Sequence, residues 1–143
     1  MRVYDTCHPE QPPIEYKVSS SGLAESISKL CWSTVEKDII IIAKKNGLIE
    51  KIDTRLDNSN AVVISVPVPS AGENVIDLEL NVNHGLIMIA SGKKVCSYGI
   101  NSLELVKSFD MPNPMTFKEE GGVSLSPNGK KFIAVMNYYM ILI

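Results

Sequence analysis

The chain has 143 residues, of which 45% are hydrophobic and 21% charged, and its formal net charge is −2. This composition is enough for a packed core, and it excludes a disordered chain and a strongly basic nucleic-acid binder. The longest unbroken apolar runs, such as residues 86–90, are far shorter than a membrane span, so we expect no membrane partner. The three cysteines, Cys7, Cys31 and Cys96, are odd in number and widely separated, which favours a reducing, intracellular compartment.

The first twenty residues predict the end of one structural unit. Residues 1–5 are typical of the end of a third strand, and residues 6–13 form a proline-bearing connection. Residues 14–18 predict an outer strand, and the polar residues 19–22 lead to the next unit. We therefore expect the chain to enter in the middle of a repeat.

Residues 27–66 predict a complete antiparallel meander of four strands. The second strand holds four consecutive isoleucines, a β-branched run that is typical of a strand buried on both faces. Pro67 and Pro69 end the fourth strand. The four strands are predicted at residues 27–32, 38–43, 48–52 and 61–66.

The turn in the middle of this meander is Lys44-Lys45-Asn46-Gly47. Asn-Gly between two apolar runs is a strong hairpin signal, because a type I′ turn needs positive φ at both central residues. We therefore expect a type I′ turn at Asn46-Gly47, with Asp53 closing the strand that follows.

The rest of the chain predicts a second complete unit and a partial third one. A proline-bearing link at residues 110–115 separates them, and a Pro-Asn-Gly turn at residues 127–129 lies inside the partial unit. The strands are predicted at residues 75–80, 86–90, 95–98, 103–109, 122–125, 131–136 and 138–143.

These units recur at a regular spacing. Trp32, Leu80 and Leu125 end equivalent first strands at intervals of 48 and 45 residues. Third strands end at Tyr4, Ile52 and Tyr98, at intervals of 48 and 46 residues. A period in the mid-forties with four strands per repeat is the signature of propeller blades. The repeat markers are Tyr4, Asp5, Trp32, Asn46, Gly47, Ile52 and Asp53.

The predicted fold is all-β, a segment of a WD-repeat β-propeller with about three four-stranded antiparallel blades, two complete and two partial. The blade parts fall at residues 1–20, 26–68, 74–111 and 115–143. Because a closed ring takes ~4–8 blades, we interpret the chain as a segment of a longer propeller or as a truncated gene product. A small β-sandwich with eight to ten strands is the alternative.

Four stretches of sequence carry a family resemblance: MRVYDTCHPEQPP (1–13), SKLCWSTVEKDII (28–40), LIMIASGKKV (86–95) and LELVKSFDMPNPMT (103–116). In this order and spacing they resemble the serine-threonine kinase receptor-associated protein family of WD-repeat propellers. The resemblance implies a seven-bladed, non-catalytic interaction scaffold of the cytoplasm and nucleus. It also implies association with the survival-of-motor-neuron complex in spliceosomal particle (mRNA splicing) assembly and with receptor kinases. The small WD-repeat subunit of translation initiation factor three is the alternative relative.

The sequence departs from the WD pattern in its first complete unit. WD repeats usually place Gly-His before the first strand, but residues 21–24 contain no histidine. Ile52 takes the place of the third-strand aromatic residue, and Asn46 replaces the usual turn aspartate. The buried hydrogen-bonded set of WD repeats therefore cannot form, and we expect this unit to rely on apolar packing by residues 39–42.

Candidate sites for chemistry are scarce. Cys7-His8 could belong to a metal site, but the only other histidine is His84 and no Cys-x-x-Cys occurs, so we interpret both as turn residues. Glu119-Glu120 could be an acid pair, yet neighbours on an extended chain point apart. Trp32 is interpreted as a packing residue. We expect no catalytic residue, cofactor or metal. The alternative is an enzyme whose active site lies in the missing blades or in a propeller funnel.

Paired lysines are the candidate interaction patch. Lys44-Lys45 and Lys93-Lys94 lie 49 residues apart in equivalent turns, so we expect them on one face of the propeller. Such a patch would attract acidic segments or phosphates of partner proteins in a multi-subunit complex; RNA contact is a weaker alternative. Ordinary solvated turns are the simpler interpretation. We expect Lys130-Lys131 on the opposite face.

Overall fold

The computed structural model describes residues 1–16, 26–57, 59–69, 73–113, 115–118, 120–136 and 139–143. In these residues the regular structure consists of β-strands and one turn of 3-10 helix, η1 (Val82–His84). The prediction of an all-β propeller segment is confirmed. The described helices include none long and apolar enough to cross a membrane.

The strands form two complete blades and two partial ones, and every strand pair is antiparallel. The first complete blade contains β3 (Ile27–Trp32), β4 (Ile39–Lys44), β5 (Leu48–Asp53) and β6 (Val62–Pro67). The second contains β7 (Val75–Asn81), β8 (Leu86–Ser91), β9 (Lys94–Gly99) and β10 (Leu105–Asp110). The partial blades contain β1 (Arg2–Val3) with β2 (Ile14–Glu15), and β11 (Gly122–Leu125), β12 (Phe132–Met136) and β13 (Tyr139–Leu142).

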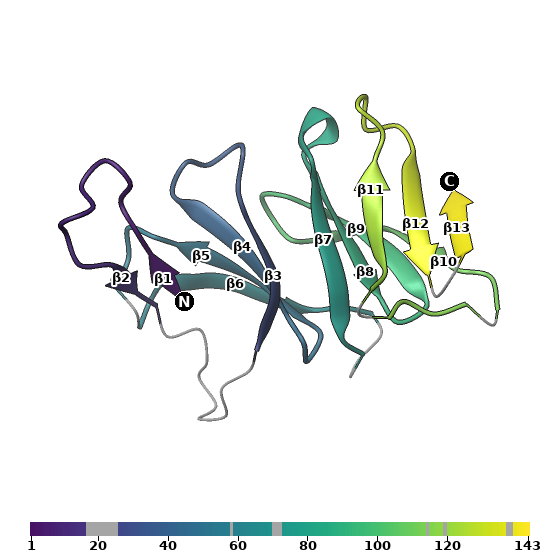
Figure 1. The fold of residues 1–143 in the computed structure, drawn as a ribbon, viewed down its shortest axis with the longest axis horizontal. Helices are drawn as coiled ribbons and strands as arrows, with labels where there is room; N and C mark the ends of the chain where they lie inside the picture. Colours follow the sequence, from purple (N-terminus) through teal and green to yellow (C-terminus); the bar gives the residue numbers. More distant parts are fainter. Residues whose placement is uncertain (17–25, 58, 70–72, 114, 119, 137–138) are drawn as a thin grey trace.

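The blades stand side by side in chain order (Figure 1). Strand β3 contacts β7, and β7 contacts β11. The first strands of successive units therefore lie next to each other. A bulge interrupts β3 between Ile27 and Lys29, and the equivalent bulge interrupts β7 between Val75 and Asp77, 48 residues later. The repeat spacing seen in the sequence therefore also separates equivalent bulges in the backbone.

The core lies between the sheets. All six residues of β4 are buried, as predicted for a strand covered on both faces. Ile39 and Ile41 face the second complete blade, whereas Ile40 and Ile42 face the β1–β2 pair. Each blade therefore buries its apolar faces against its two neighbours, as stacked repeats do.

The β1–β2 pair packs on the face of the first complete blade that Ile40 and Ile42 form. The Tyr16 hydroxyl donates a hydrogen bond to the Thr54 carbonyl (2.5 Å), and the ring is buried. Met1 and Val3 pack against the cluster that contains Ile40. Residues 17 and 18 of the predicted outer strand lie outside the described residues, as does residue 138 of the last predicted strand.

The turn between β4 and β5 differs from the prediction. Gly47 has φ +83°, but Asn46 does not have positive φ, so the predicted type I′ turn is wrong. The loop instead holds three residues, and the Gly47 N–H bonds to the Lys44 carbonyl (3.1 Å). This is a turn followed by a glycine bulge, in which only the last loop residue needs the left-handed region.

The first complete blade does not rely on apolar packing alone, and that prediction is corrected. Lys44 Nζ donates to Glu50 Oε1 at 2.7 Å, with both side chains almost fully covered. Lys51 is also buried and donates to Glu36 Oε1 (2.8 Å) and to the Asn101 carbonyl (3.0 Å) of the second complete blade. The last bond joins the two blades, so buried charge contributes where the WD hydrogen-bonded set is missing.

Candidate interaction surface

The four predicted lysines have different environments. Lys44 is 2% exposed and paired with Glu50, so its assignment to an exposed patch is wrong. As the last residue of β4 it lies on the same face of the strand as Ile40 and Ile42, which turn toward the β1–β2 pair. Lys45 and Lys93 lie in turns and are exposed. Lys94 is half-buried and pairs with Asp110 Oδ1 at 2.8 Å, and this hydrogen bond raises the pKa of Lys94.

Both lysine turns lie at the same rim of the propeller segment, together with the links between blades. The Val68 N–H bonds to the Gly47 carbonyl (2.8 Å) at the first turn. At the second turn, the Phe117 N–H bonds to the Gly92 carbonyl (2.7 Å) and the Met111 N–H to the Lys93 carbonyl (2.8 Å). The links therefore cover part of this rim and leave Lys45 and Lys93 exposed beside them.

A recess of about 230 Å³ opens at this rim between the first strands of the two complete blades. Lys29 and Lys45 supply its cationic groups, and Ser28 and Asn74 supply neutral polar groups. Ile27, Val75 and Ile76 complete the lining. The Ser28 hydroxyl already donates to the Ala43 carbonyl (3.0 Å), so the two lysines and the Asn74 amide are the groups that could hold a carboxylate or phosphate here.

Lys29 was missed by the sequence analysis, which considered only the paired lysines. Its ammonium lies 3.4 Å from Asp77 Oδ1 on the neighbouring strand β7. The other oxygen of Asp77 accepts the Val123 N–H of β11 (3.0 Å). Asp77 thus joins the first strands of three successive units, and Lys29 keeps half of its side chain exposed at the recess.

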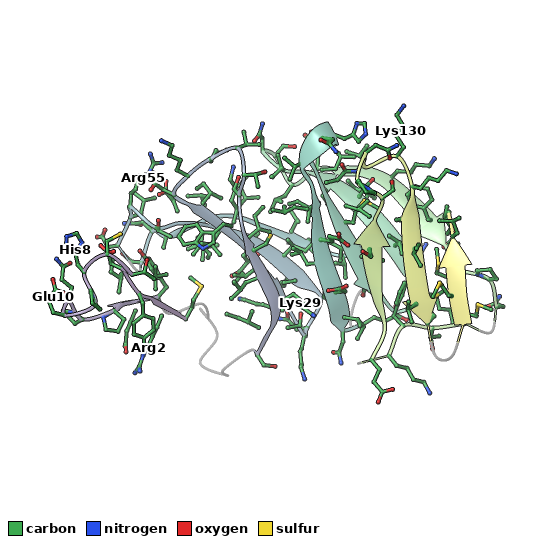
Figure 2. All side chains as sticks on the ribbon, turned by 45° about the horizontal axis from the view of Figure 1, so that its top comes forward. Arg2, His8, Glu10, Lys29, Arg55 and Lys130 are labelled. Carbon is green, nitrogen blue, oxygen red and sulfur yellow. The ribbon has the colours of Figure 1, made fainter. Side chains whose placement is uncertain are left out.

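The opposite rim carries the turns between the first and second strands. The Asn81 side chain donates to the Gly129 carbonyl (2.8 Å), and the Asn83 side chain donates to the Pro127 carbonyl (2.9 Å). These bonds hold the β11–β12 turn, which contains Lys130, against the turn that follows β7. Figure 2 shows Lys29 and Lys130 at opposite edges of the blades, as expected for lysines of the two rims.

The repeat markers also have different environments. Ile52 is 1% exposed in the core, whereas Tyr4, just past β1, is 62% exposed. Trp32 is 48% exposed, so its interpretation as a packing residue holds for only about half of its surface. Asp5 accepts the Cys7 and His8 N–H groups, and its second oxygen lies 2.9 Å from His8 Nδ1. These bonds make residues 5–8 a turn.

Asp53 forms an ion pair with Arg55 at the rim opposite the recess. The Arg55 guanidinium donates to both of its carboxylate oxygens, at 2.9 Å and 2.6 Å. These hydrogen bonds lower the pKa of Asp53 from 3.8 to about 2. Asp53, which takes the position of the terminal aspartate of WD repeats, therefore orders the turn that follows β5.

The described residues contain no group of three or more His, Cys, Asp and Glu side chains that could hold a metal ion. Burial raises the pKa of the Cys31 thiol to about 11 and also raises that of Cys96, so neither is primed as a nucleophile. Glu119 of the candidate acid pair lies outside the described residues.

Comparison with solved structures shows which fold this is. Raptor from Chaetomium thermophilum matches with a TM-score of 0.65 and 16% identity, over 81% of this chain and 10% of that one. The WD40 β-propeller domain of Doa1 matches with a TM-score of 0.62 and 16% identity, over 86% of this chain and 38% of that one. No protein-family model and no curated protein matches the sequence. The chain has the fold of a WD40 propeller segment and spans well under half of either structure.

Proposed function

We propose that this chain is a non-catalytic protein-interaction scaffold that binds acidic or phosphorylated segments of partner proteins. The observation that carries the proposal is the recess between the two complete blades, where Lys29 and Lys45 flank neutral hydrogen-bonding groups. Lys93 extends the positive charge along the same rim. A carboxylate or phosphate at the recess would contact both blades at once, which favours an extended peptide over a small metabolite.

The partner class follows from the sequence resemblance. The serine-threonine kinase receptor-associated protein family implies assembly of spliceosomal particles with the survival-of-motor-neuron complex, receptor-kinase signalling, and a location in cytoplasm and nucleus. The WD40 propeller fold supports this proposal because it is the fold of that family. We therefore propose the same partners and the same compartments for this chain.

Reversal of the rim charges tests the proposal. The variant combines Lys29→Glu, Lys45→Glu and Lys93→Glu, and leaves Lys44 intact because that residue is buried. Binding of the purified survival-of-motor-neuron complex is measured by biolayer interferometry at low and high salt. Exposed ion pairs are worth roughly 0.2–1 kcal/mol each, so we expect about tenfold weaker binding at low salt and a flatter salt dependence.

The matched control reverses Lys130 and Lys131 on the opposite rim, and we expect it to bind like the parent. Equal loss in both variants would mean that net charge, and not the recess, governs binding. Binding of purified initiation factor three in place of the survival-of-motor-neuron complex would reject the proposed partner and keep the scaffold. Binding of polyuridylate RNA, but of neither protein complex, would reject the scaffold proposal.

A further inference from the structure

The recess between the two complete blades lies where two equivalent β-bulges meet. Ser28 of β3 and Ile76 of β7 are the residues that these bulges leave outside the cross-strand register, and both line the recess. The geometry of the repeat therefore forms the recess. Its volume of about 230 Å³ lies below the ~300–1,000 Å³ of small-molecule pockets, so it suits a group of about the size of one residue.

The charged groups at the recess give it an excess of one positive charge. Lys29 and Lys45 line it, and Asp77 Oδ1 lies 3.4 Å from the Lys29 ammonium. Asp77 also accepts the N–H groups of Leu78 (3.0 Å) and Val123 (3.0 Å), so its carboxylate does not depend on Lys29 alone. An ammonium has three N–H donors, and the contact with Asp77 therefore leaves donors of Lys29 for a ligand.

This charge balance favours a carboxylate over a phosphate. A carboxylate carries one negative charge and neutralises the excess, whereas a phosphate monoester carries about −1.5 to −2 at pH 7. Attraction to the two lysines doubles for a dianion, but the cost of removing an ion from water grows with the square of its charge. The second charge would also lie uncompensated beside Asp77, whose side chain is only 19% exposed.

The apolar part of the recess decides which carboxylate fits. This part consists of Ile27, Val75 and Ile76. Neighbouring side chains of an extended peptide point to opposite sides, so an internal aspartate or glutamate that enters the recess turns its neighbours away from these apolar groups. The last residue of a chain carries its carboxylate and its side chain on the same Cα atom. An aliphatic C-terminal residue can therefore meet the charged and the apolar parts together.

We propose that the recess binds the aliphatic C-terminal residue of a partner protein. The carboxylate lies between Lys29, Lys45 and the Asn74 amide, and the aliphatic side chain lies against Ile27 and Ile76. This inference rests on the proposed binding of anionic groups at the recess. It narrows the ligand from acidic or phosphorylated segments to a free chain terminus.

Peptide binding to the parent protein tests the inference without any substitution. The probes are four fluorescein-labelled octapeptides of glycine and serine. The first ends in valine with a free carboxylate, the second ends in valine amide, and the third ends in serine with a free carboxylate. The fourth carries an internal phosphoserine and ends in an amide.

Fluorescence anisotropy measures the affinity of each peptide, and we expect the valine carboxylate to bind best. The valine amide should bind at least about tenfold more weakly, because it has lost hydrogen bonds to a charged group. The serine-ended peptide should also bind about tenfold more weakly, because it has lost the apolar contact. The phosphoserine peptide should bind more weakly than the valine carboxylate.

Two variants place these contacts at the recess. Lys29→Met keeps most of the side chain's length and removes its charge, so it should weaken binding of the valine carboxylate and leave the valine amide unchanged. Ile76→Ser should weaken binding of the valine carboxylate more than that of the serine-ended peptide, a difference that general loss of folding would not produce. The control Lys130→Met, on the opposite rim, should bind all four peptides as the parent does.

Equal affinity for the valine carboxylate and its amide would overturn the inference, and so would tighter binding of the phosphoserine peptide. Binding of none of the four peptides would overturn it as well. The proposed function is judged separately, by reversal of Lys29, Lys45 and Lys93 and binding of the survival-of-motor-neuron complex. If that reversal weakens binding, the scaffold stands even where the chain terminus is not recognised.

Discussion

Replacing Lys44 by methionine tests whether buried charge holds the first complete blade together. The substitution keeps the side chain's length but removes the ammonium 2.7 Å from Glu50 Oε1. Glu50 is left beside the Ser65 hydroxyl at 3.4 Å, and its Oε2 already has no hydrogen-bond partner among the described residues. Removing one member of a buried ion pair costs about 3–5 kcal/mol, because the remaining charge is neither solvated nor paired.

Urea unfolding followed by circular dichroism measures this cost at one fixed protein concentration. With a slope of roughly 2 kcal/mol per molar urea, we expect the midpoint of Lys44→Met to fall by about 2 M. The double variant Lys44→Met with Glu50→Leu should regain most of that loss, since no charge is left buried. Lys45→Met, at the exposed neighbouring position, should shift stability by less than about 0.5 kcal/mol. A shift below about 0.5 M for Lys44→Met, or no recovery in the double variant, would refute the reasoning.

Two further predictions concern a carboxylate and a glycine. Asp53 has its pKa lowered from 3.8 to about 2 by Arg55, so its contribution to stability is present above pH 4 and is lost as pH falls through about 2. Asp53→Asn should therefore lower the urea midpoint at pH 6 but match the parent near pH 2. A Cβ at Gly92 (φ +53°) would lie 1.3 Å from Glu73 Oε2, a side chain that can move away. Gly92→Ala should thus cost about 1–2 kcal/mol of backbone strain, nearly unchanged in a Glu73→Ala background.

Periodic apolar runs and turn residues made the fold predictable from the sequence. The isoleucines of β4 are β-branched, consecutive and bounded by turn signals, and both faces of that strand are buried. The spacing that predicted repeats reappears in the bulges of β3 and β7. The Asn46-Gly47 turn type was less predictable, because Asn-Gly also fits a three-residue loop in which only Gly47 has positive φ.

Burial of charge was harder to predict because it depends on where each strand ends and on partners in the neighbouring blade. Lys44 belongs to a run that looks like a polar turn, yet strand β4 extends one residue further and directs it toward Glu50. Lys29 meets Asp77, which lies one repeat later, at the equivalent position of the next first strand. Opposite charges at equivalent positions of successive repeats are a signal that sequence comparison between blades can find.

The buried pairs and the apolar core have different roles in holding the blades together. A buried ion pair contributes little net stability, because desolvation offsets most of its attraction, but it restricts how two faces can pack. Lys51 shows this role, since its bond to the Asn101 carbonyl fixes the first complete blade against the second. The stability of stacked blades must then come mainly from apolar area buried between them.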